Sequence, residues 1–491
     1  MPLTHPLIVP AIRLDHDAEA ETRKAFERAK QPWVAGFILF GGEAEQVAKL
    51  TADLRDAADR PIFISADMER GAGQQVAGLT RLPDFGIYGL AATPDEVAAH
   101  AELTAREAGS VGIDVLFGPC LDVRSEMDNP ILGNRSFGFD PQRVADLGSA
   151  WISGAQRGGA LPVAKHAPGH GGTREDSHEA LPVVHADEQT LLARDLMPFA
   201  KALGLSRCPA LMAAHVAYPA LDAEGTIATF SAPILGKLRE LAGPDATDLL
   251  LFTDAMMMAG ATVPGGEPEA AALALEAGCD MLLYPDEPEA IAAALDDGWW
   301  GPRSVARRDA FLARGAALRA DLADPHGCGE PTPAIEDAPR RVAARALRMA
   351  GGVVPYPQLL VLVDDDGIEA RGDLLAAAAA RRGTPVVRLR AGEDTTFVLP
   401  ESPEDGPRYL NVAVVVFAQA RAWKGASGVS EAGRELVRTV QAAVHARPGF
   451  ADVTWCAPRP GGAMGRHVPG NGPQVERALV KALFDEVAGS V

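Results

Sequence analysis

Residues 249–260 read LLLFTDAMMMAG, a short aliphatic run that ends in a carboxylate and is followed by a turn containing glycine. Four to eight apolar residues between turn signals are typical of a strand that is buried on both faces of a parallel sheet. Similar runs recur through the first 300 residues, separated by longer stretches of helical periodicity. This alternation predicts repeated βα units and an α/β fold.

Eight such strands are expected in the first 300 residues, which is the number that closes a (β/α)8 barrel of the TIM type. They are Leu7–Ile12, Gly36–Phe40, Ile62–Ala66, Val115–Gly118, Pro162–Lys165, Ala210–Ala214, Leu249–Thr253 and Met281–Tyr284. The spacers are long enough for crossover helices, and several begin near Asp, Thr or Pro, as helices tend to. Helices are expected over Pro94–Ser110, Pro141–Arg157 and Asp187–Leu203.

The pattern changes after the barrel, where residues 326–337 read HGCGEPTPAIED and indicate a linker that enters a basic helix over Ala338–Met349. Beyond it a smaller α/β open-sheet domain is expected. Its strands are Leu359–Val363, Pro385–Leu389, Val412–Phe417 and Asp452–Cys456, and its helices include Gly372–Arg382 and Ser430–Ala446. The predicted boundaries are a catalytic barrel over residues 1–335, a linker helix over 336–356 and a C-terminal α/β sandwich domain over 357–491.

Composition agrees with a two-domain globular protein. The chain has 491 residues, of which 47% are hydrophobic and 23% charged, close to the averages for globular proteins. Its formal net charge of -20 argues against nucleic acid or anionic lipid as a partner, because a polyanion gains nothing from neutralising phosphates.

The cysteines and the apolar runs indicate a reducing, cytoplasmic setting. The five cysteines are scattered and show no CxxC spacing, so neither a disulfide framework nor a zinc cluster is expected. The first residues have no basic n-region of a secretory signal. The longest aliphatic run, near Val412–Phe417, is far shorter than the roughly 20 residues that span a bilayer.

Ionisable side chains gather where the predicted barrel strands end. In a parallel barrel these ends share one mouth, whereas the opposite rim mainly stabilises the fold. The residues found there are Asp67, Glu69, Asp122, Lys165, His166, His215 and Asp254. Their concentration at one rim predicts an active site.

The densest segment is residues 163–184, VAKHAPGHGGTREDSHEALPVV, in which two glycine-rich turns lie between Lys165 and the pair Asp176 and His178. A carboxylate two residues from an imidazole can orient the ring and support its protonated form, which suits an acid or base near neutral pH. The alternative is a metal site, since four histidines are close in sequence, but their spacing matches no strong zinc pattern. These histidines are His166, His170, His178 and His185.

Asp254 emerges from a strongly apolar strand, which suits a nucleophile. The competing interpretation is an N-cap for the following helix, a common role for Asp after a strand. The three methionines that follow are more often packing residues than catalytic ones.

At these residues the sequence resembles glycoside hydrolase family 3, and within it the β-N-acetylhexosaminidase branch. Residues 165–178, KHAPGHGGTREDSH, are similar to that branch's loop signature, and residues 252–260, FTDAMMMAG, to its nucleophile segment. Residues 66–71 (ADMERG), 129–141 (NPILGNRSFGFDP) and 212–222 (MAAHVAYPALD) resemble further segments of the family. The resemblance covers essentially the whole predicted barrel.

The resemblance implies a retaining, exo-acting β-N-acetylglucosaminidase that works in two steps through a glycosyl-enzyme. Asp254 would be the nucleophile, and His178 with Asp176 the general acid/base dyad. Asp67, Arg135, Lys165, His166 and His215 would hold the sugar's hydroxyl groups, with Asp122 in support. The implied partner is a small carbohydrate, with no metal or other cofactor, and the chain would act as a monomer or homodimer.

One departure from the family pattern is that residues 69–78, ERGAGQQVAG, place Gly78 where the family has arginine. Arg70 or Arg81 is a candidate substitute. A β-glucosidase and a β-N-acetylglucosaminide phosphorylase stay open as alternatives, because a neutral imidazole repels an incoming phosphate less than a carboxylate does. A sugar-binding protein with a decayed site and a metal-dependent hydrolase on the same barrel are the alternatives from other classes.

Overall fold

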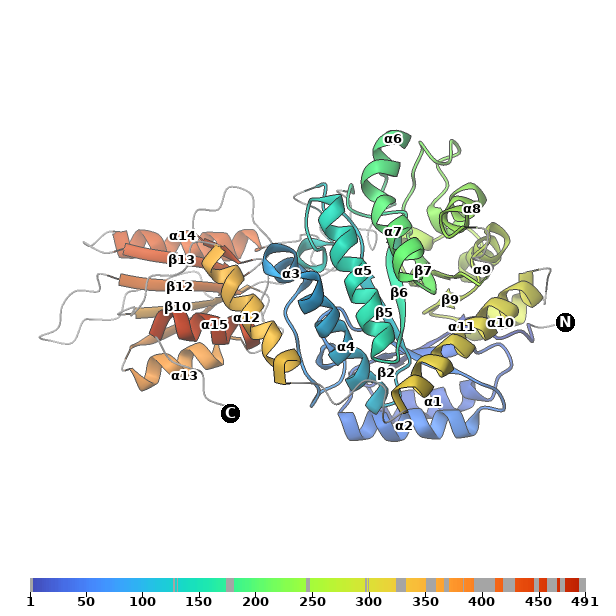
Figure 1. Ribbon diagram of the computed structural model, residues 1–491, viewed down its shortest axis with the longest axis horizontal. Coiled ribbons are helices and arrows are strands. Elements are labelled where there is room, and N and C mark those ends of the chain that lie inside the picture. Colours follow the sequence, from blue (N-terminus) through green and yellow to red (C-terminus); the bar gives the residue numbers. More distant parts are fainter. Residues whose placement is uncertain are drawn as a thin grey trace, which may run out of the picture. The chain divides into compact units, whose positions relative to one another are not determined.

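The computed structural model of the chain is shown in Figure 1. It describes residues 3–126, 129, 131–173, 181–243, 248–295, 298, 300–323, 333–349, 359–365, 371–382, 384–392, 411–417, 429–445, 450–456, 466–468 and 473–484. The chain divides into two compact units. The first comprises Met1–Arg81, Thr93–Glu126 and Ser136–Glu336, and the second comprises Leu82–Ala92, Met127–Arg135 and Asp337–Val491.

The first unit is built on a seven-stranded parallel sheet whose strands follow one another in chain order. The strands are β2 (Ala11–Arg13), β3 (Gly36–Phe40), β4 (Phe63–Asp67), β5 (Val115–Cys120), β6 (Leu161–Ala167), β7 (Ala210–Ala213) and β8 (Leu250–Thr253). Two short strands, β1 (Ile8–Val9) and β9 (Leu282–Leu283), pair with each other in parallel.

Backbone contacts join the two ends of this series. Ile8 of β1 pairs with Leu282 of β9 and also bridges to Val34, next to β3, while Met281 bridges to Phe252 of β8. The parallel α/β arrangement predicted from the sequence is confirmed, and the curled sheet fits a TIM-like domain.

Helices separate the strands of the first unit. They are α1 (Ala18–Ala29), α2 (Ala44–Ala57), α4 (Pro94–Ser110), α5 (Pro141–Arg157), α6 (Glu188–Thr190), α7 (Met197–Ser206), α8 (Ala232–Leu241), α9 (Gly266–Ala277), α10 (Pro288–Ala294) and α11 (Trp300–Ala323). Helix α4 begins at its predicted residue because Thr93 and Glu96 form a capping box around Pro94. Helices α4 and α5 lie side by side (Figure 1).

The helix predicted over Asp187–Leu203 is instead divided into α6, a π-helical turn over Leu191–Asp195, and α7. A π-turn holds one more residue than an α-turn. Here the backbone N–H of Leu196 bonds the carbonyl of Leu191, and both Leu191 and Asp195 are fully buried. Sequence periodicity at 3.6 residues does not predict this turn.

Aromatic rings fill the inside of the curled sheet. The ring of Phe252 on β8 lies edge-on to Phe63 of β4 and Phe117 of β5, with centroids 6.0 and 5.5 Å apart. Strands β4 and β5 are not neighbours of β8 in the sheet, so these rings meet across its interior. The rings therefore pack the strands against one another and hold their carboxyl ends on rigid backbone.

The second unit contains a five-stranded parallel sheet in the order β11-β10-β12-β13-β14. Its strands are β10 (Leu359–Asp364), β11 (Val386–Arg390), β12 (Asn411–Phe417), β13 (Phe450–Cys456) and β14 (Arg466–Val468). Its helices are α3 (Phe85–Ala91), α12 (Pro333–Met349), α13 (Asp373–Arg381), α14 (Glu431–His445) and α15 (Pro473–Phe484), and α12 begins in the first unit's last residues. Strand β14 and helix α15 were not predicted. The domain boundaries at residues 335 and 356 stay predictions.

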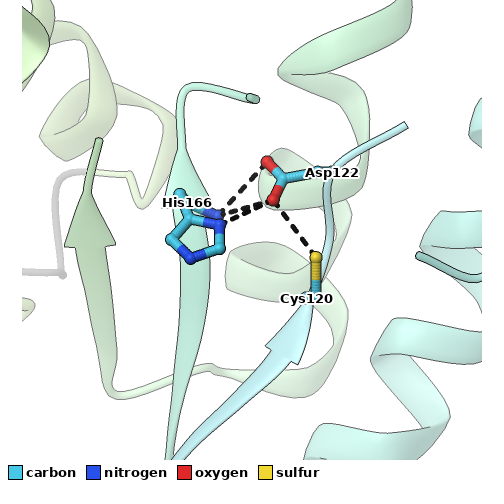
Figure 2. A group of neighbouring side chains, drawn as sticks. All are labelled: Cys120, Asp122 and His166. Atoms are coloured by element: carbon cyan, nitrogen blue, oxygen red, sulfur yellow. Dashed lines mark hydrogen bonds and ion pairs between the residues drawn. The ribbon is translucent and has the colours of Figure 1, made fainter. Parts of the chain in front are cut away.

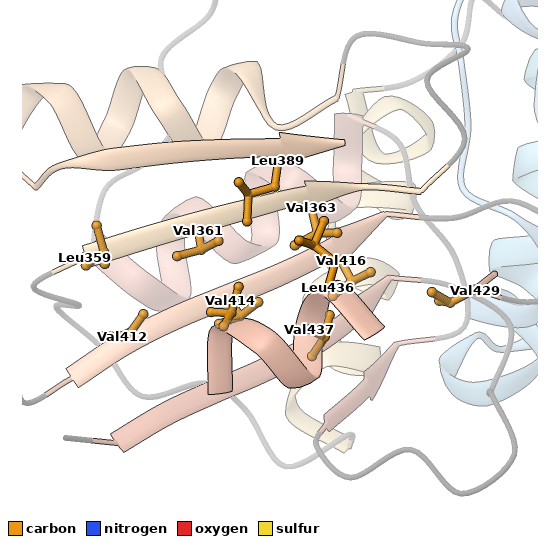
Figure 3. Packing of buried hydrophobic residues seen from close by; sticks show 11 residues of the cluster. Leu359, Val361, Val363, Leu389, Val412, Val414, Val416, Val429, Leu436 and Val437 are labelled. Atoms are coloured by element: carbon orange, nitrogen blue, oxygen red, sulfur yellow. The ribbon is translucent and has the colours of Figure 1, made fainter. Parts of the chain in front are cut away.

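The core of this second sheet is almost entirely aliphatic. The packed side chains are those of Val440 and of the residues labelled in Figure 3: Leu359, Val361, Val363, Leu389, Val412, Val414, Val416, Val429, Leu436 and Val437. Alternate residues of β10 and β12 point to the same face of the sheet and pack against α14.

Among the described residues, no helix has both the length and the apolar character needed to cross a membrane.

Candidate active site

The side chains predicted to carry the chemistry follow the carboxyl ends of five consecutive strands, β4 to β8. Asp67 is the last residue of β4, Asp122 lies two residues after β5, Lys165 and His166 are near the end of β6, His215 lies two residues after β7, and Asp254 directly follows β8. Parallel strands bring these ends to one edge of a sheet, so the fold gathers residues that are up to 187 positions apart in the chain.

Lys165 is held between two carboxylates. Its ammonium nitrogen Nζ lies 2.5 Å from Oδ1 of Asp67 and 2.7 Å from Oε1 of Glu69. The side chains of Lys165 and Glu69 are nearly inaccessible, whereas 30% of the Asp67 side chain is exposed. Asp67 is therefore the member of this group that still faces the open side of the site.

Asp122 forms the centre of a second, fully buried group (Figure 2). Its Oδ2 accepts from the ring Nδ1 of His166 at 2.7 Å and from the thiol of Cys120 at 3.1 Å. The backbone N–H groups of His166 and His170 also donate to this carboxylate, the second at 2.6 Å. Because Asp122 is occupied by these donors, it can fix the His166 ring and the turn at His170.

The ionisation of this group follows from its surroundings. Burial alone raises the pKa of Asp122, but the nearby His166 and the donors around the carboxylate outweigh it and lower the pKa to about 2. Burial and the neighbouring His166 lower the pKa of His170 to about 4. At neutral pH Asp122 is therefore an anion, and His170 is neutral.

Asp254 lies at the mouth, partly exposed, with few partners. Its Oδ1 accepts from the backbone N–H of Ala255 at 2.8 Å, and no other residue in the described part of the chain donates to this carboxylate. Burial raises its pKa, but the fields of His166 and His215 and the Ala255 N–H together leave the pKa below the ordinary value. Asp254 is thus an ionised carboxylate with the oxygen Oδ2 available.

Asp254 is not an N-cap. The next helical turn spans Ala259–Ala261, with Met258 as its N-cap, and helix α9 begins at Gly266. The alternative role weighed for Asp254 from the sequence is therefore absent, since an N-cap residue immediately precedes its helix.

His215 is completely buried, and both ring nitrogens have partners inside the protein. Nε2 lies 3.1 Å from the carbonyl oxygen of Ala255, and Nδ1 lies 2.8 Å from the hydroxyl of Thr229. A carbonyl can only accept, so Nε2 carries a proton. Burial lowers the pKa of His215, and the neutral ring therefore ties β7 to the residue that follows Asp254.

Three predicted site residues are not among the side chains described above. Asp176 and His178 lie outside the described residues. Arg135 ends a short 3-10 helix, Gly133–Arg135, which belongs to the second compact unit, and its guanidinium bonds the carbonyl of Ile131.

The altered segment after Glu69 folds as a compact turn. A 3-10 helix spans Ala72–Gln74, and the N–H of Gly73 bonds the carbonyl of Thr80 at 2.9 Å. A Cβ at Gly73 would lie 2.3 Å from the carbonyl oxygen of Leu79, so only glycine fits there. Gly78 has a φ of +90°, a conformation that suits glycine and not the arginine that the family pattern has at this point.

Sequence reasoning missed the supporting residues. Cys120 and Thr229 are ordinary buried residues by pattern, and each gains a role only through its contact with Asp122 or His215. Glu69 was noticed at the rim but was not assigned to the site. A buried carboxylate two residues after a strand-ending Asp is the signal that identifies it in hindsight.

A family model described as the glycosyl hydrolase family 3 N terminal domain matches residues 8–308 of the chain. A β-hexosaminidase of Tolumonas auensis is 36% identical over 314 residues, which are 63% of this chain and 90% of the relative. The predicted resemblance is confirmed: the chain belongs to glycosyl hydrolase family 3, and it is a glycoside hydrolase.

Solved structures resemble the chain over different lengths. A family 3 β-N-acetylglucosaminidase from Paenibacillus sp. str. FPU-7 has a TM-score of 0.76 at 24% identity and covers 99% of this chain and 96% of its own, a likeness of fold. Native NagZ from Neisseria gonorrhoeae is 29% identical with a TM-score of 0.55, over 70% of this chain and 97% of its own.

Proposed function

We propose that the chain is a retaining, exo-acting β-N-acetylglucosaminidase that removes terminal β-linked N-acetylhexosamine. Three observations support the proposal: the family, the name β-hexosaminidase carried by its relatives, and the loop sequence KHAPGHGGTREDSH. The free, buried thiols of Cys120, Cys208 and Cys279 support a reducing cytoplasmic location, and the protein would act there as a monomer or homodimer.

The observation that carries the proposal is the state of Asp254. A nucleophilic carboxylate must be ionised, must be rigidly placed and must keep one oxygen for the anomeric carbon. Asp254 meets these needs, because histidines hold its pKa low, Ala255 N–H and the adjacent strand fix it, and Oδ2 has no donor among the described residues. Its attack would give a glycosyl-enzyme, which water then opens with net retention.

The acid and base of the reaction are assigned to His178, oriented by Asp176. Protonation of the glycosidic oxygen by the imidazole would release the aglycone, and the neutral imidazole would then take a proton from the attacking water. This assignment rests on the sequence of the loop and on the resemblance of that loop to the family signature.

Binding of the sugar is assigned to the polar and charged side chains around Asp254. Asp67 is exposed enough to accept from hydroxyl groups, and its ion pair with Lys165 keeps it in place. His166 is a second contact, with its ring fixed by Asp122, and Arg135 is carried over from the family segment around it. The protein contacts of His215 favour a role in positioning Asp254 over direct contact with the sugar.

The proposal is tested by assaying purified protein on a panel of p-nitrophenyl glycosides and by trapping the intermediate. We expect turnover of the β-N-acetylglucosaminide to exceed that of the β-glucoside by at least about a hundredfold, because a pocket that binds a polar substituent rejects substrates lacking it. A 5-fluoro N-acetylglucosaminyl fluoride should add one sugar to Asp254, located by mass spectrometry of peptides. A higher rate on the glucoside would instead select the β-glucosidase alternative.

Phosphate distinguishes a hydrolase from a phosphorylase at the same site. Product analysis with and without inorganic phosphate should give free N-acetylglucosamine in both cases. A phosphorylated sugar as the main product would overturn the hydrolytic second step while leaving the glycosyl-enzyme intact.

A further inference from the structure

Three different donor atoms converge on one point beside the proposed site. The thiol sulfur of Cys120, Oδ2 of Asp122 and Nδ1 of His166 all lie within 4.8 Å of one another (Figure 2). Oδ2 is the shared partner, 3.1 Å from the sulfur and 2.7 Å from the ring nitrogen. In the described part of the chain this is the one group of three or more His, Cys, Asp or Glu residues with that geometry.

These atoms suit a soft divalent cation. Thiolate, imidazole and carboxylate are the three ligand types that bind zinc and its heavier relatives, in tetrahedral sites with bonds of about 2.0–2.3 Å. Those bond lengths separate the ligand atoms of a tetrahedron by roughly 3.3–3.7 Å. The two short contacts to Oδ2 would therefore open by about half an ångström, a change within reach of side-chain rotation.

Without a cation, the three groups are joined by hydrogen bonds. The thiol and the ring N–H both point at Oδ2, so each proton sits where a bond to a metal would replace it. The ligands are also held by backbone, since Cys120 ends β5, His166 lies in β6, and these strands pair with each other. Two of the ligands are therefore on paired strands, and Asp122 contacts both of them, so the three ligand atoms are already held close together.

We propose that Cys120, Asp122 and His166 form a binding site for a soft divalent cation of the zinc and cadmium class, and that its occupancy stops the glycosidase reaction. The cation is an inhibitor and not a participant in the chemistry. The inhibition rests on the proposed function, because it requires that His166 contact the sugar, whereas the binding does not.

The proton balance of binding is defined. Cys120 loses its thiol proton to solvent and binds as thiolate, and Asp122 binds as the carboxylate that it already is. His166 binds through Nδ1, so its ring proton moves to Nε2 and the ring stays neutral. One proton is released for each cation, and the charge of the three groups with their cation changes from minus one to zero.

The tautomer change explains the inhibition. A neutral ring that donates from Nδ1 to Asp122 presents its opposite nitrogen Nε2 as an acceptor. With a cation on Nδ1, Nε2 becomes a donor. A hydroxyl group of the sugar that donated to this nitrogen would then meet an N–H, and the field of His166 on Asp254 would change as well.

The test is a cadmium titration of the full-length protein, read by the ultraviolet charge-transfer band of a cadmium–thiolate bond and, in parallel, by hydrolysis of p-nitrophenyl β-N-acetylglucosaminide. The three ligands are nearly inaccessible, so each addition is followed to a constant reading. We expect the charge-transfer band to reach its full intensity at one cadmium ion per protein chain. The rate of hydrolysis should fall as the band grows. Because binding releases the thiol proton, the apparent affinity should rise with pH.

Cys120→Ser and Cys120→Ala remove the thiolate while leaving the small side chain, and each variant's rate is compared with its own cadmium-free rate. We expect the band to disappear and cadmium affinity at this site to fall by on the order of a hundredfold. Cys208→Ser is the matched control, because Cys208 is a buried thiol that contacts only backbone carbonyls in the described residues. It should keep both the band and the inhibition.

The outcomes separate the two claims. Absence of a band, or a band that survives Cys120→Ser, would overturn the cation site. Inhibition that survives Cys120→Ser and is lost in His178→Ala would overturn the claim that this site causes the inhibition. A band that is lost in Cys120→Ser with a catalytic rate indifferent to cadmium supports the site and overturns the role given to His166 in the proposed function.

Discussion

Asp254 and Asp365 occupy comparable positions in the two units, and their surroundings differ. Each follows a buried, aliphatic strand of a parallel sheet: Asp254 follows β8, and Asp365 follows β10. Asp365 accepts from the N–H and the hydroxyl of Ser430, the residue before helix α14, at 2.6–3.1 Å. Asp254 accepts a single bond from its neighbour Ala255 and lies in the field of two histidines.

The comparison teaches that an Asp after a parallel strand marks a position and not a function. At the end of β10 the carboxylate is used to join a strand to a helix, as a structural residue. At the end of β8 the same group keeps an available oxygen beside the rings of His166 and His215, and its pKa stays below the ordinary value, which is what a nucleophile needs. The sequence pattern identifies both positions, and the residues that surround each carboxylate determine whether its role is structural or catalytic.

The largest effect is expected from truncating the two aspartates in parallel. Asp254→Ala should lower kcat by about ten-thousandfold or more, because no other described carboxylate stands in its place. Azide added to Asp254→Gly should restore part of the rate by attacking from the vacated side and give the inverted glycosyl azide.

Asp365→Ala should keep the rate of the folded enzyme and lower its free energy of unfolding by about 1–3 kcal/mol, since the partly buried donors of Ser430 lose their acceptor. Equal rate losses in Asp254→Ala and Asp365→Ala would contradict the assignment of a catalytic role to Asp254 and a structural role to Asp365.

His178→Ala sharpens the comparison by testing whether the rim around Asp254 carries out acid catalysis. We expect a loss of about a hundredfold to ten-thousandfold on substrates with poor leaving groups. Activated aryl glycosides should lose far less, because an aryloxide that leaves easily needs little protonation. A Brønsted plot of rate against leaving-group pKa measures this, and an unchanged slope would remove His178 from the acid role.

Lys165→Met should be the most destabilising single change at the rim. It removes the ammonium group that Asp67 and Glu69 share, and breaking a buried ion pair by removing one partner costs about 3–5 kcal/mol. The double variant Lys165→Met with Glu69→Gln should recover part of that loss. Urea unfolding of the three proteins measures the effect, with Arg388→Met as control for an exposed pair in the second unit, where a change below about 1 kcal/mol is expected.

The smallest expected effect concerns acid stability. Burial lowers the pKa of His100 to about 3, so between pH 3 and 6.5 the unfolded chain binds more protons and stability falls as pH falls. The loss should be about 2 kcal/mol between pH 6.5 and 5 for this residue. Burial raises the pKa of Asp195 to about 6, despite its pairing with Arg194, and this residue acts in the opposite direction.

Two variants separate these contributions. His100→Gln should make the acid loss of stability shallower, and Asp195→Asn should make it steeper, because the stabilisation that Asp195 provides below pH 6 is removed. Free energies of unfolding in urea at several values of pH provide the measurement. Parallel curves for the two variants would contradict the assignment of these groups.

Local sequence was sufficient wherever short-range chemistry sets the structure. The helix over Pro94–Ser110 was predicted to the residue because Thr93, Pro94 and Glu96 form a complete start signal. Strand β3 was predicted to the residue because a run of five residues, four of them buried, lies between turn signals. The position of Asp254, Lys165 and His166 at strand ends followed from the same reading.

Other features depend on contacts between distant residues, which no local pattern contains. The π-turn at Leu191–Asp195 departs from the 3.6-residue period that a helical pattern predicts, and both of its end residues are buried. The two hydrogen bonds of the His215 ring lead to Thr229 and Ala255, and both partners look unremarkable in the sequence. Strand β14 is three residues long, below the length at which an apolar run is recognisable.

The sequence by itself determined the βα alternation, the family and the set of ionisable residues at the strand ends, because each of these is written in spacing and residue type. Only the tertiary structure decided which carboxylate is buried with which donor. That decision fixes Asp122 as the partner of His166, leaves Asp254 ionised with an oxygen to spare, and brings a thiol 3.1 Å from a carboxylate. Charge state and hydrogen bonding are properties of neighbours, and neighbours across a parallel sheet are assigned by the fold.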